Sequence, residues 1–284
     1  MKRTEKWQWT VLATAAGQAV IPFLLTRNAV SPLLSNVCLL SPASYALVTW
    51  YPIGLLSLAY GIYQAIPARI NRELHFVLSR GLVVVYVSFV AWLVLVYLEW
   101  QLFSMFFFVV MLAVLTLLFE RVLRERSSLG RLEQVLVLGQ IALYSGWVTV
   151  LVFSNAAVWL SSHGWPENGP AGWLWQALLL LGLCWHNEYW LTRFNGDIVY
   201  GCMLLWTLGG IVVRLQHYND TLLQVMIILA GMTLVLTHLL FRSPVYRLVA
   251  GRRSQAGHTD HGFRFQGPHL AEKSTRNKRV DPIT

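Results

Sequence analysis

Long apolar runs, separated by charged or turn-forming residues, fill most of the chain between residues 7 and 241. A helix that crosses a bilayer needs about 20 mainly apolar residues, and no acidic residue lies near the middle of these runs. The pattern predicts an all-α, polytopic membrane bundle of about eight transmembrane helices. The predicted spans are 7–26, 45–65, 81–98, 102–119, 132–160, 173–190, 198–213 and 221–241.

Two of the predicted connections have a definite local signal. Only Glu99, Trp100 and Gln101 separate the third span from the fourth, so these two helices are expected to form a tight hairpin. The fifth span is expected to end at segment 165–170 (WPENGP), because proline removes a backbone donor and Asn-Gly favours a turn.

The basic residues predict the orientation of the bundle. When alternate loops are assigned to one side, that side holds every lysine and arginine except Arg27, Arg80 and Arg214. By the positive-inside rule both termini are then cytoplasmic, as an even number of spans also requires. The net charge of +9 follows from this topology and from attraction to anionic headgroups, so we expect a lipid bilayer and no nucleic acid as partner.

The chain divides by composition into a transmembrane domain, 1–241, and a basic tail, 242–284. The tail loses apolar periodicity and gathers Ser, Gly, His, Pro and charged residues, which is typical of disorder. We expect a solvated cytoplasmic tail, with a docking element as the alternative. The three cysteines, Cys38, Cys184 and Cys202, are not expected to form a structural disulfide.

Few residues in the spans are suited to chemistry. All thirteen acidic residues fall in loops, at helix ends or in the tail, so proton or sodium coupling lacks the usual acid at bilayer depth. His75, His186 and His238 have no partner at a spacing suited to a metal. We therefore expect no enzyme, no catalytic residue and no metal site.

Tryptophans carry more information than charges do. Most lie near the predicted membrane interfaces, but Trp50, Trp92, Trp147 and Trp206 fall inside spans. An indole N–H in hydrocarbon needs a partner, so these four rings are expected to face the bundle interior or a cavity. Core packing is the alternative for any one ring; as a group they favour an aromatic-lined cavity for a flat, apolar ligand.

Small residues recur along the second predicted span. Ser57, Gly61 and Ala65 form a stripe that allows another helix to approach closely. We interpret the stripe as packing within the bundle, with a homodimer as the alternative.

Two helices resemble a known family. Segment 41–50 (SPASYALVTW), followed by 61–65 (GIYQA), resembles the stretch of the tryptophan-rich sensory proteins in which a proline opens the second helix and Ile-Tyr-Gln closes it. This is the TspO/MBR, or translocator-protein, family. Tyr144, Trp147 and Asn155 match the spacing of its fifth helix, and Ala91-Trp92-Leu93 and Trp206 with Gly210 are similar to marks of the longer bacterial members.

The sequence departs from the family pattern at four positions. Leu47 and Gly54 stand where aromatic residues are usual, Leu143 replaces a proline, and Phe89 occupies a position that is typically asparagine. The resemblance implies a TspO-like bundle of five helices over about 7–160, extended by three helices over about 173–241, in a bacterial inner membrane. It also implies an aromatic pocket that binds tetrapyrroles or sterol-like lipids in a sensory or regulatory role.

The candidate ligand-binding residues are Trp50, Trp92, Tyr144, Trp147 and Asn155. At 100° per residue, Trp147 lies about 60° and Asn155 about 20° from Tyr144, so the three share one stripe of a helix. The alternative is that Asn155 bonds a neighbouring backbone while the rings fill the core. No cofactor is expected, and a tetrapyrrole is the candidate ligand.

Two other functions compete with ligand binding. Eight helices could enclose a transport path for a small hydrophobic molecule without ion coupling, but no inverted repeat supports it. An intramembrane enzyme that modifies a lipid or pigment ranks third, because acids, bases and metal ligands are missing from the spans.

The predicted topology can be tested with reporter fusions. The charge bias places the loops that follow Thr26, Gly164 and Tyr218 on the outer side of the membrane. Fusions at these three positions should therefore report an external location. A cytoplasmic signal from the fusion at Gly164 would contradict the scheme.

Overall fold

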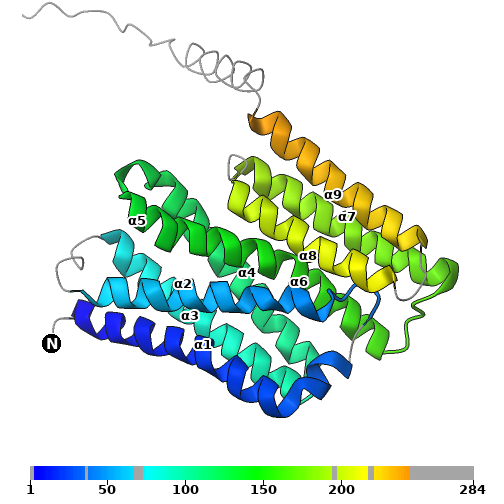
Figure 1. Ribbon diagram of the computed structural model, residues 1–284, viewed down its shortest axis with the longest axis horizontal. Helices are drawn as coiled ribbons and strands as arrows, with labels where there is room; N and C mark the ends of the chain where they lie inside the picture. Colours follow the sequence, from blue (N-terminus) through cyan, green and yellow to red (C-terminus); the bar gives the residue numbers. More distant parts are fainter. Residues whose placement is uncertain (1–2, 36–37, 67–72, 194–196, 217–220, 243–284) are drawn as a thin grey trace, which may run out of the picture. The chain divides into compact units, whose positions relative to one another are not determined.

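The computed structural model describes residues 3–35, 38–66, 73–193, 197–216 and 221–242, and helices make up nearly all of these ranges (Figure 1). No strand occurs in them. The long helices are α1 (Arg3–Ser35), α2 (Trp50–Ala65), α3 (Glu73–Tyr97), α4 (Gln101–Arg124), α6 (Gln140–Ser162), α7 (Gly169–Arg193), α8 (Ile198–Gln216) and α9 (Thr221–Arg242).

Shorter helical segments join these elements. A 3-10 helix, η1 (Ser44–Thr49), leads into α2, and another, η3 (Arg126–Ser128), follows α4. One turn of α-helix, α5 (Arg131–Glu133), is then followed by a π-helix, η4 (Gln134–Gly139), which runs directly into α6. The fifth predicted span is therefore continuous but locally widened.

The helices confirm an all-α, polytopic membrane bundle. Five segments are long and apolar enough to cross a membrane by length and composition, and Thr221–Thr237 is a shorter apolar helix. The five are Ser44–Ala65, Leu74–Tyr97, Gln101–Arg124, Arg131–Ser162 and Ile198–Gln216. Helix α3 begins eight residues before the predicted span, because His75 and Ser79 are buried within the bundle rather than exposed in a loop.

The hairpin between α3 and α4 has the predicted short connection. Glu99 adopts a φ of 63°, in the left-handed region, and this reverses the chain direction. The N–H of Trp100 donates to the carbonyl of Leu95 at 2.9 Å, which satisfies an acceptor at the end of α3. Helix α4 then begins at Gln101 and packs along α3.

Helix α6 lies at the centre of the helical unit. It contacts α2, α4, α7 and α8, and its residues from Tyr144 to Leu151 are all buried. Such a helix is apolar on every side because it faces protein in all directions. Gly146 allows the closest approach, since a Cβ there would lie 2.7 Å from the carbonyl oxygen of Tyr200 on α8.

The small-residue stripe of α2 packs against α1. A Cβ at Gly61 would lie 3.2 Å from the Cα of Leu12, and one at Gly54 would lie 3.5 Å from the Cα of Ala19. Ser57, between them, is buried. The stripe therefore serves packing within the chain, as first interpreted.

A connecting segment between α1 and η1 is fixed to helices that come much later in the chain. The N–H of Leu39 donates to Glu167 Oε2 at 3.2 Å, and Ser154 Oγ donates to the carbonyl of Leu40 at 2.8 Å. The N–H of Ala43 donates to the carbonyl of Gly210 at 3.0 Å. Burial beside these groups raises the pKa of the Cys38 thiol to about 11.

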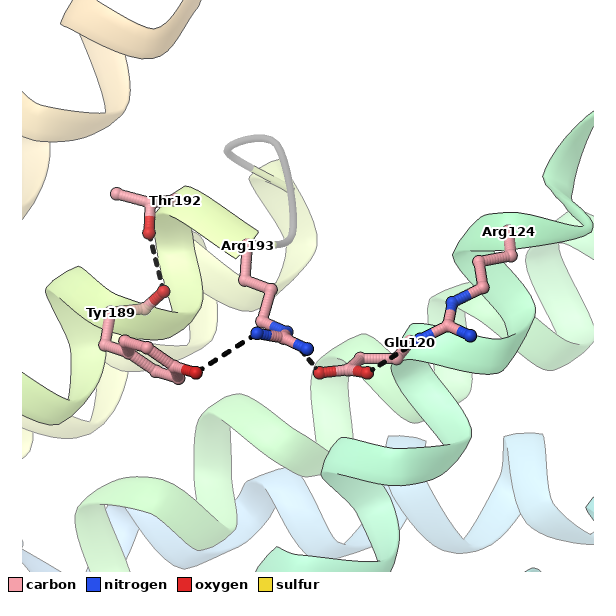
Figure 2. Close-up of polar contacts among 5 residues, drawn as sticks. All are labelled: Glu120, Arg124, Tyr189, Thr192 and Arg193. Carbon is pink, nitrogen blue, oxygen red and sulfur yellow. Dashed lines mark hydrogen bonds and ion pairs between the residues drawn. The ribbon is translucent and has the colours of Figure 1, made fainter. Parts of the chain in front are cut away.

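At the other end of the bundle, charged residues join α4 to α7 (Figure 2). We call this end, which carries Arg121, Arg124 and Arg193, the basic end. Glu120 accepts hydrogen bonds from Arg193 and, at 3.2 Å, from Arg124. Nη1 of the same Arg193 guanidinium donates to Tyr189 Oη at 3.1 Å. Because both arginines are largely exposed, this network contributes little to stability.

The tail prediction concerns 242–284, of which residues 243–284 lie outside the described residues. It stays a prediction.

The close contact between α6 and α8 predicts that alanine destabilises the protein at Gly146 but not at Gly209. Gly146→Ala should lower the free energy of unfolding by about 1–3 kcal/mol, because the added Cβ meets the Tyr200 backbone and the Met203 side chain. Gly209→Ala is the matched control, since nothing lies within 4 Å of its Cβ position. Thermal unfolding in detergent measures both. Equal midpoints for the two variants would contradict the packing.

Candidate ligand-binding site

Six aromatic rings from four helices meet between α2, α3, α4 and α6. They are Trp50 of α2, Phe89 and Trp92 of α3, Phe108 of α4, and Tyr144 and Trp147 of α6. Their centroids lie between 4.7 Å, for Trp92 and Phe108, and 6.5 Å, for Trp92 and Trp147. Most pairs are tilted or edge-to-face, the arrangements that aromatic quadrupoles prefer. We call these six residues the aromatic cluster.

The structure brings together four of the five predicted site residues. Trp50 lies 5.8 Å from Trp92 and 6.0 Å from Trp147, and Tyr144 lies 6.2 Å from Trp147. Asn155 is two turns further along α6, half-buried, and donates to the carbonyl of Leu151 at 2.8 Å. The described hydrogen bond of Asn155 therefore lies within α6 and reaches neither the aromatic cluster nor a neighbouring helix.

The prediction for Trp206 was wrong. This residue is 48% exposed on α8 and packs edge-to-face against Tyr45 at 5.7 Å. A position near the middle of a helix says nothing about which face the residue occupies, and Trp206 lies on the outer one. It belongs to the lipid-facing surface rather than to the cavity once expected.

Two members of the aromatic cluster were missed. Phe89 was noted only as a departure from the family pattern, although it precedes Trp92 by three residues and so shares its helix face. Phe108 closes the cluster from α4 at 4.7 Å from Trp92. It stands in the run Phe106, Phe107 and Phe108, where the sequence offers no signal that distinguishes the inward ring.

The aromatic cluster holds hydrogen-bond donors that lack good acceptors. Trp50 Nε1 and Trp92 Nε1 are both inaccessible to solvent and have no hydrogen-bond partner within the described part of the chain. The Tyr144 hydroxyl reaches only the thioether sulfur of Met111, at 3.9 Å, which is a weak acceptor. In hydrocarbon an unsatisfied donor costs several kcal/mol, and these three donors belong to rings of one cluster.

The rings fill the space between them. At 4.7–6.5 Å between centroids, neighbouring rings are in contact and leave no gap of ring size. A separate cavity between α6, α7 and α8 measures about 10 Å³, the volume of a single water. It is lined by Leu40, Val150, Phe153, Ser154, Leu179, Leu180, Leu183 and Ile211. A ligand at the aromatic cluster must therefore push rings apart.

A layer of polar side chains lies beside the aromatic cluster, toward the basic end. Gln140 Nε2 donates to Tyr86 Oη at 2.6 Å and to Ser57 Oγ at 2.9 Å. Ser57 in turn donates to the carbonyl of Ile53 at 2.8 Å. This layer crosslinks α2, α3 and α6 one turn from Tyr144, because Gln140 precedes Tyr144 by four residues on α6.

Sequence reasoning also missed a buried acid. Glu133 is only 4% exposed and its Oε1 lies 3.5 Å from Nε2 of His75, which is 3% exposed. The two residues are far apart in the chain, so spacing along a single helix cannot find the pair. Among the described residues no group of three or more His, Cys, Asp and Glu is arranged to hold a metal ion.

These features agree with comparison to known proteins. A family model described as TSPO-like protein matches residues 9–240, and the chain therefore belongs to this family of membrane proteins. The match extends through α7, α8 and α9 as well as the first five spans. No curated protein and no solved structure matches the chain.

The polar layer predicts strong coupling between Gln140 and Tyr86. Gln140→Leu and Tyr86→Phe each remove one side of the 2.6 Å hydrogen bond, so their effects on unfolding should not add. A double-mutant cycle should give an interaction energy of about 0.5–3 kcal/mol. Denaturant unfolding of the four proteins in detergent measures it. Strict additivity would show that the bond contributes nothing.

Proposed function

We propose that the protein binds a hydrophobic, aromatic ligand at the aromatic cluster and acts in sensing or regulation rather than catalysis. One observation carries this proposal: the indole N–H groups of Trp50 and Trp92 are buried together without acceptors in the described chain. A ligand that brings acceptors into the cluster removes the cost of both unsatisfied donors. A purely structural cluster has no reason to retain two such groups.

The chemistry of the cluster favours a tetrapyrrole over a sterol-like lipid. Edge-to-face indoles that separate would present flat faces to a conjugated macrocycle, and stacking stabilises such contacts. A tetrapyrrole also carries several acceptors, in its carboxylates and ring nitrogens, whereas a sterol offers a single hydroxyl. The Tyr144 hydroxyl, which now faces only the Met111 sulfur, supplies a third donor.

Binding of this kind opens the cluster by induced fit. The ring contacts of the ligand-free protein must be broken, and their loss lowers the net affinity. Trp50 is the ring best placed to move, because it is only half-buried and stands at the first residue of α2. Trp92 and Trp147 are buried and provide the fixed walls.

We place the protein in a bacterial inner membrane with both termini in the cytoplasm. The basic end of the bundle supports this orientation, since Arg121, Arg124 and Arg193 gather where α4 and α7 finish. The aromatic cluster then lies deeper in the membrane than the polar layer of Gln140. Tetrapyrroles and similar ligands partition into the membrane, so they reach the cluster from the bilayer.

The proposed role of the indole N–H groups in ligand binding can be tested by substitution. Trp92→Phe removes an indole N–H that has no partner in the described protein, so no hydrogen bond described for the ligand-free protein is lost. The affinity for protoporphyrin IX should fall by roughly 10- to 100-fold, because a hydrogen bond to a charged acceptor contributes about 1.5–3 kcal/mol. Trp147→Phe should also weaken binding, while Asn155→Ala should have less effect, because its amide bonds Leu151.

Trp206→Phe is the matched control for this experiment. It removes the same indole from the outer face of α8, where the described ring contact is with Tyr45 and not with a member of the cluster. Binding is read by quenching of tryptophan fluorescence, and thermal midpoints without ligand are measured in parallel. Unchanged affinity in Trp92→Phe together with lost stability would show that the cluster is only structural.

A further inference from the structure

The charged network at the basic end has a geometry that its small contribution to stability does not explain. Figure 2 shows two guanidinium groups from different helices directed at one carboxylate: Arg124 of α4 and Arg193 of α7 both donate to Glu120. They use different oxygens of that carboxylate, Oε2 and Oε1. The acid thus holds two like charges beside one another, and the three side chains together keep a net positive charge.

Both arginines leave much of their hydrogen-bonding capacity unused. A guanidinium carries five N–H donors. Within the described chain, Arg124 donates only through Nη2, to Glu120, while Arg193 donates through Nε to Glu120 and through Nη1 to Tyr189. The side chains of Arg124 and Arg193 are 70% and 48% exposed. The other N–H groups are therefore accessible to a partner from outside the protein.

Arg193 is held in place by its surroundings. Besides its bond to Glu120, it donates to the Tyr189 hydroxyl at 3.1 Å. Its Cζ also lies 5.9 Å from the centre of the Tyr189 ring and 5.8 Å from that of Trp190. These contacts leave Nη2 unoccupied in the described chain. A guanidinium that is already ordered loses less conformational freedom when it binds a further group.

The two arginines stand where a membrane span ends. Glu120 and Arg124 belong to the last turns of α4, which is long and apolar enough to cross a membrane, and Arg193 is the last residue of α7. Tyrosine and tryptophan, here Tyr189 and Trp190, are typical of the interface between hydrocarbon and headgroups. The group that an exposed arginine meets at this depth is the phosphate of a lipid.

A phosphodiester fits this pair of guanidinium groups. Arginine binds phosphate through two parallel N–H···O bonds, and a phosphodiester offers two oxygens that can accept from neighbouring guanidiniums. Other acids near this end are already engaged: Glu125 pairs with Arg121 at 2.8 Å, and Glu188 accepts from Thr237 at 2.7 Å. A headgroup without a cation of its own is favoured, because a choline or ammonium group would lie close to the arginines.

We propose that Arg124 and Arg193 form a binding site for the phosphodiester headgroup of an anionic phospholipid. The headgroup accepts hydrogen bonds from both guanidiniums, while Glu120 keeps them side by side. A lipid bound there joins the end of α4 to the end of α7, and so ties a later helix to the earlier part of the bundle. The site includes no residue of the aromatic cluster and does not depend on the proposed function.

Titration of the full-length protein in detergent with phosphatidylglycerol tests the site. Native mass spectrometry measures the affinity for the first bound lipid. Arg124→Gln and Arg193→Gln should each weaken it about fivefold, the factor expected for one basic residue at a lipid headgroup. Arg126→Gln is the matched control, because it removes the same charge from an exposed side chain that has no ion pair in the described chain.

The control separates a defined site from general attraction between lipid and protein. An equal loss of affinity in Arg126→Gln would show that any positive charge at this end serves, and would overturn the proposal. Phosphatidylcholine should bind more weakly than phosphatidylglycerol to the wild-type protein. Inorganic phosphate at the same concentration should not displace the lipid, because it has no acyl chains. Displacement by phosphate would mean that the site takes the free anion, and the lipid proposal would fail.

A second measurement uses thermal unfolding in two membranes. The protein is placed in nanodiscs of phosphatidylcholine alone, or of equal parts phosphatidylcholine and phosphatidylglycerol. The wild-type midpoint should be higher in the anionic membrane, because a ligand that binds only the folded state stabilises it. Arg124→Gln and Arg193→Gln should reduce this difference, whereas Arg126→Gln should not.

Use of the difference removes the purely structural effect of each substitution. Loss of an ion pair with Glu120 lowers the midpoint in both membranes alike, so it cancels. The same difference in all four proteins would overturn the lipid site. Neither measurement uses a tetrapyrrole, so a failure of the proposed function leaves this test unaffected.

Discussion

The rest of the structure depends on one constraint: α6 is almost completely buried by protein from Gln140 to Leu151. Polar groups on such a stretch cannot reach water or headgroups, so they depend on partners within the protein. Gln140 Nε2 does so with Ser57 and Tyr86, and Thr149 Oγ1 lies 3.4 Å from the hydroxyl of Tyr200, whereas Gln140 Oε1 and Ser145 Oγ have no partner within the described residues. The same enclosure requires Gly146, because α8 passes too close for any side chain. The hydrogen bonds and the close packing of α6 therefore fix the positions of the surrounding helices.

Against that background, two indoles of the aromatic cluster differ from the buried polar side chains nearer the basic end. Toward the basic end several buried side chains keep hydrogen bonds although some of their atoms have none: Glu133 accepts from Tyr63 and Gly130, and Gln140 Nε2 donates twice while Gln140 Oε1 has no partner within the described residues. In the aromatic cluster the indole N–H groups of Trp50 and Trp92 have no acceptor within the described residues. Packing alone does not explain the difference, because phenylalanine would fill similar space without a donor. The contrast is between polar side chains that each keep at least one hydrogen bond and two indoles that have none within the described residues.

The sequence predicts the fold well because hydrophobicity along the chain is a local property. Span lengths, the hairpin at Glu99 and the close packing at Gly61 all follow from runs and spacings of neighbouring residues. The site is predicted only in part. Trp50, Trp92 and Trp147 were expected in the interior because an indole N–H needs a partner in hydrocarbon, and Tyr144 was selected by the family spacing on the fifth span. The indole argument misplaced Trp206, since it does not specify a helix face. The pairing of His75 with Glu133 depends on how separate helices meet, which no pattern within one helix encodes.

The connecting segment between α1 and η1 has a consequence for how the protein is assembled. Leu39, Leu40 and Ala43 obtain their hydrogen-bond partners from Glu167, Ser154 and Gly210, more than a hundred residues further along the chain. During synthesis this early segment therefore waits, with its backbone groups in water, until α6 and α8 have been inserted. A chain cut after the first five spans would lose the partner of Ala43 and the helix that closes over Gly146. The later helices are thus part of the smallest unit that can assemble, and a shorter ancestor or fragment would need a different solution at this surface.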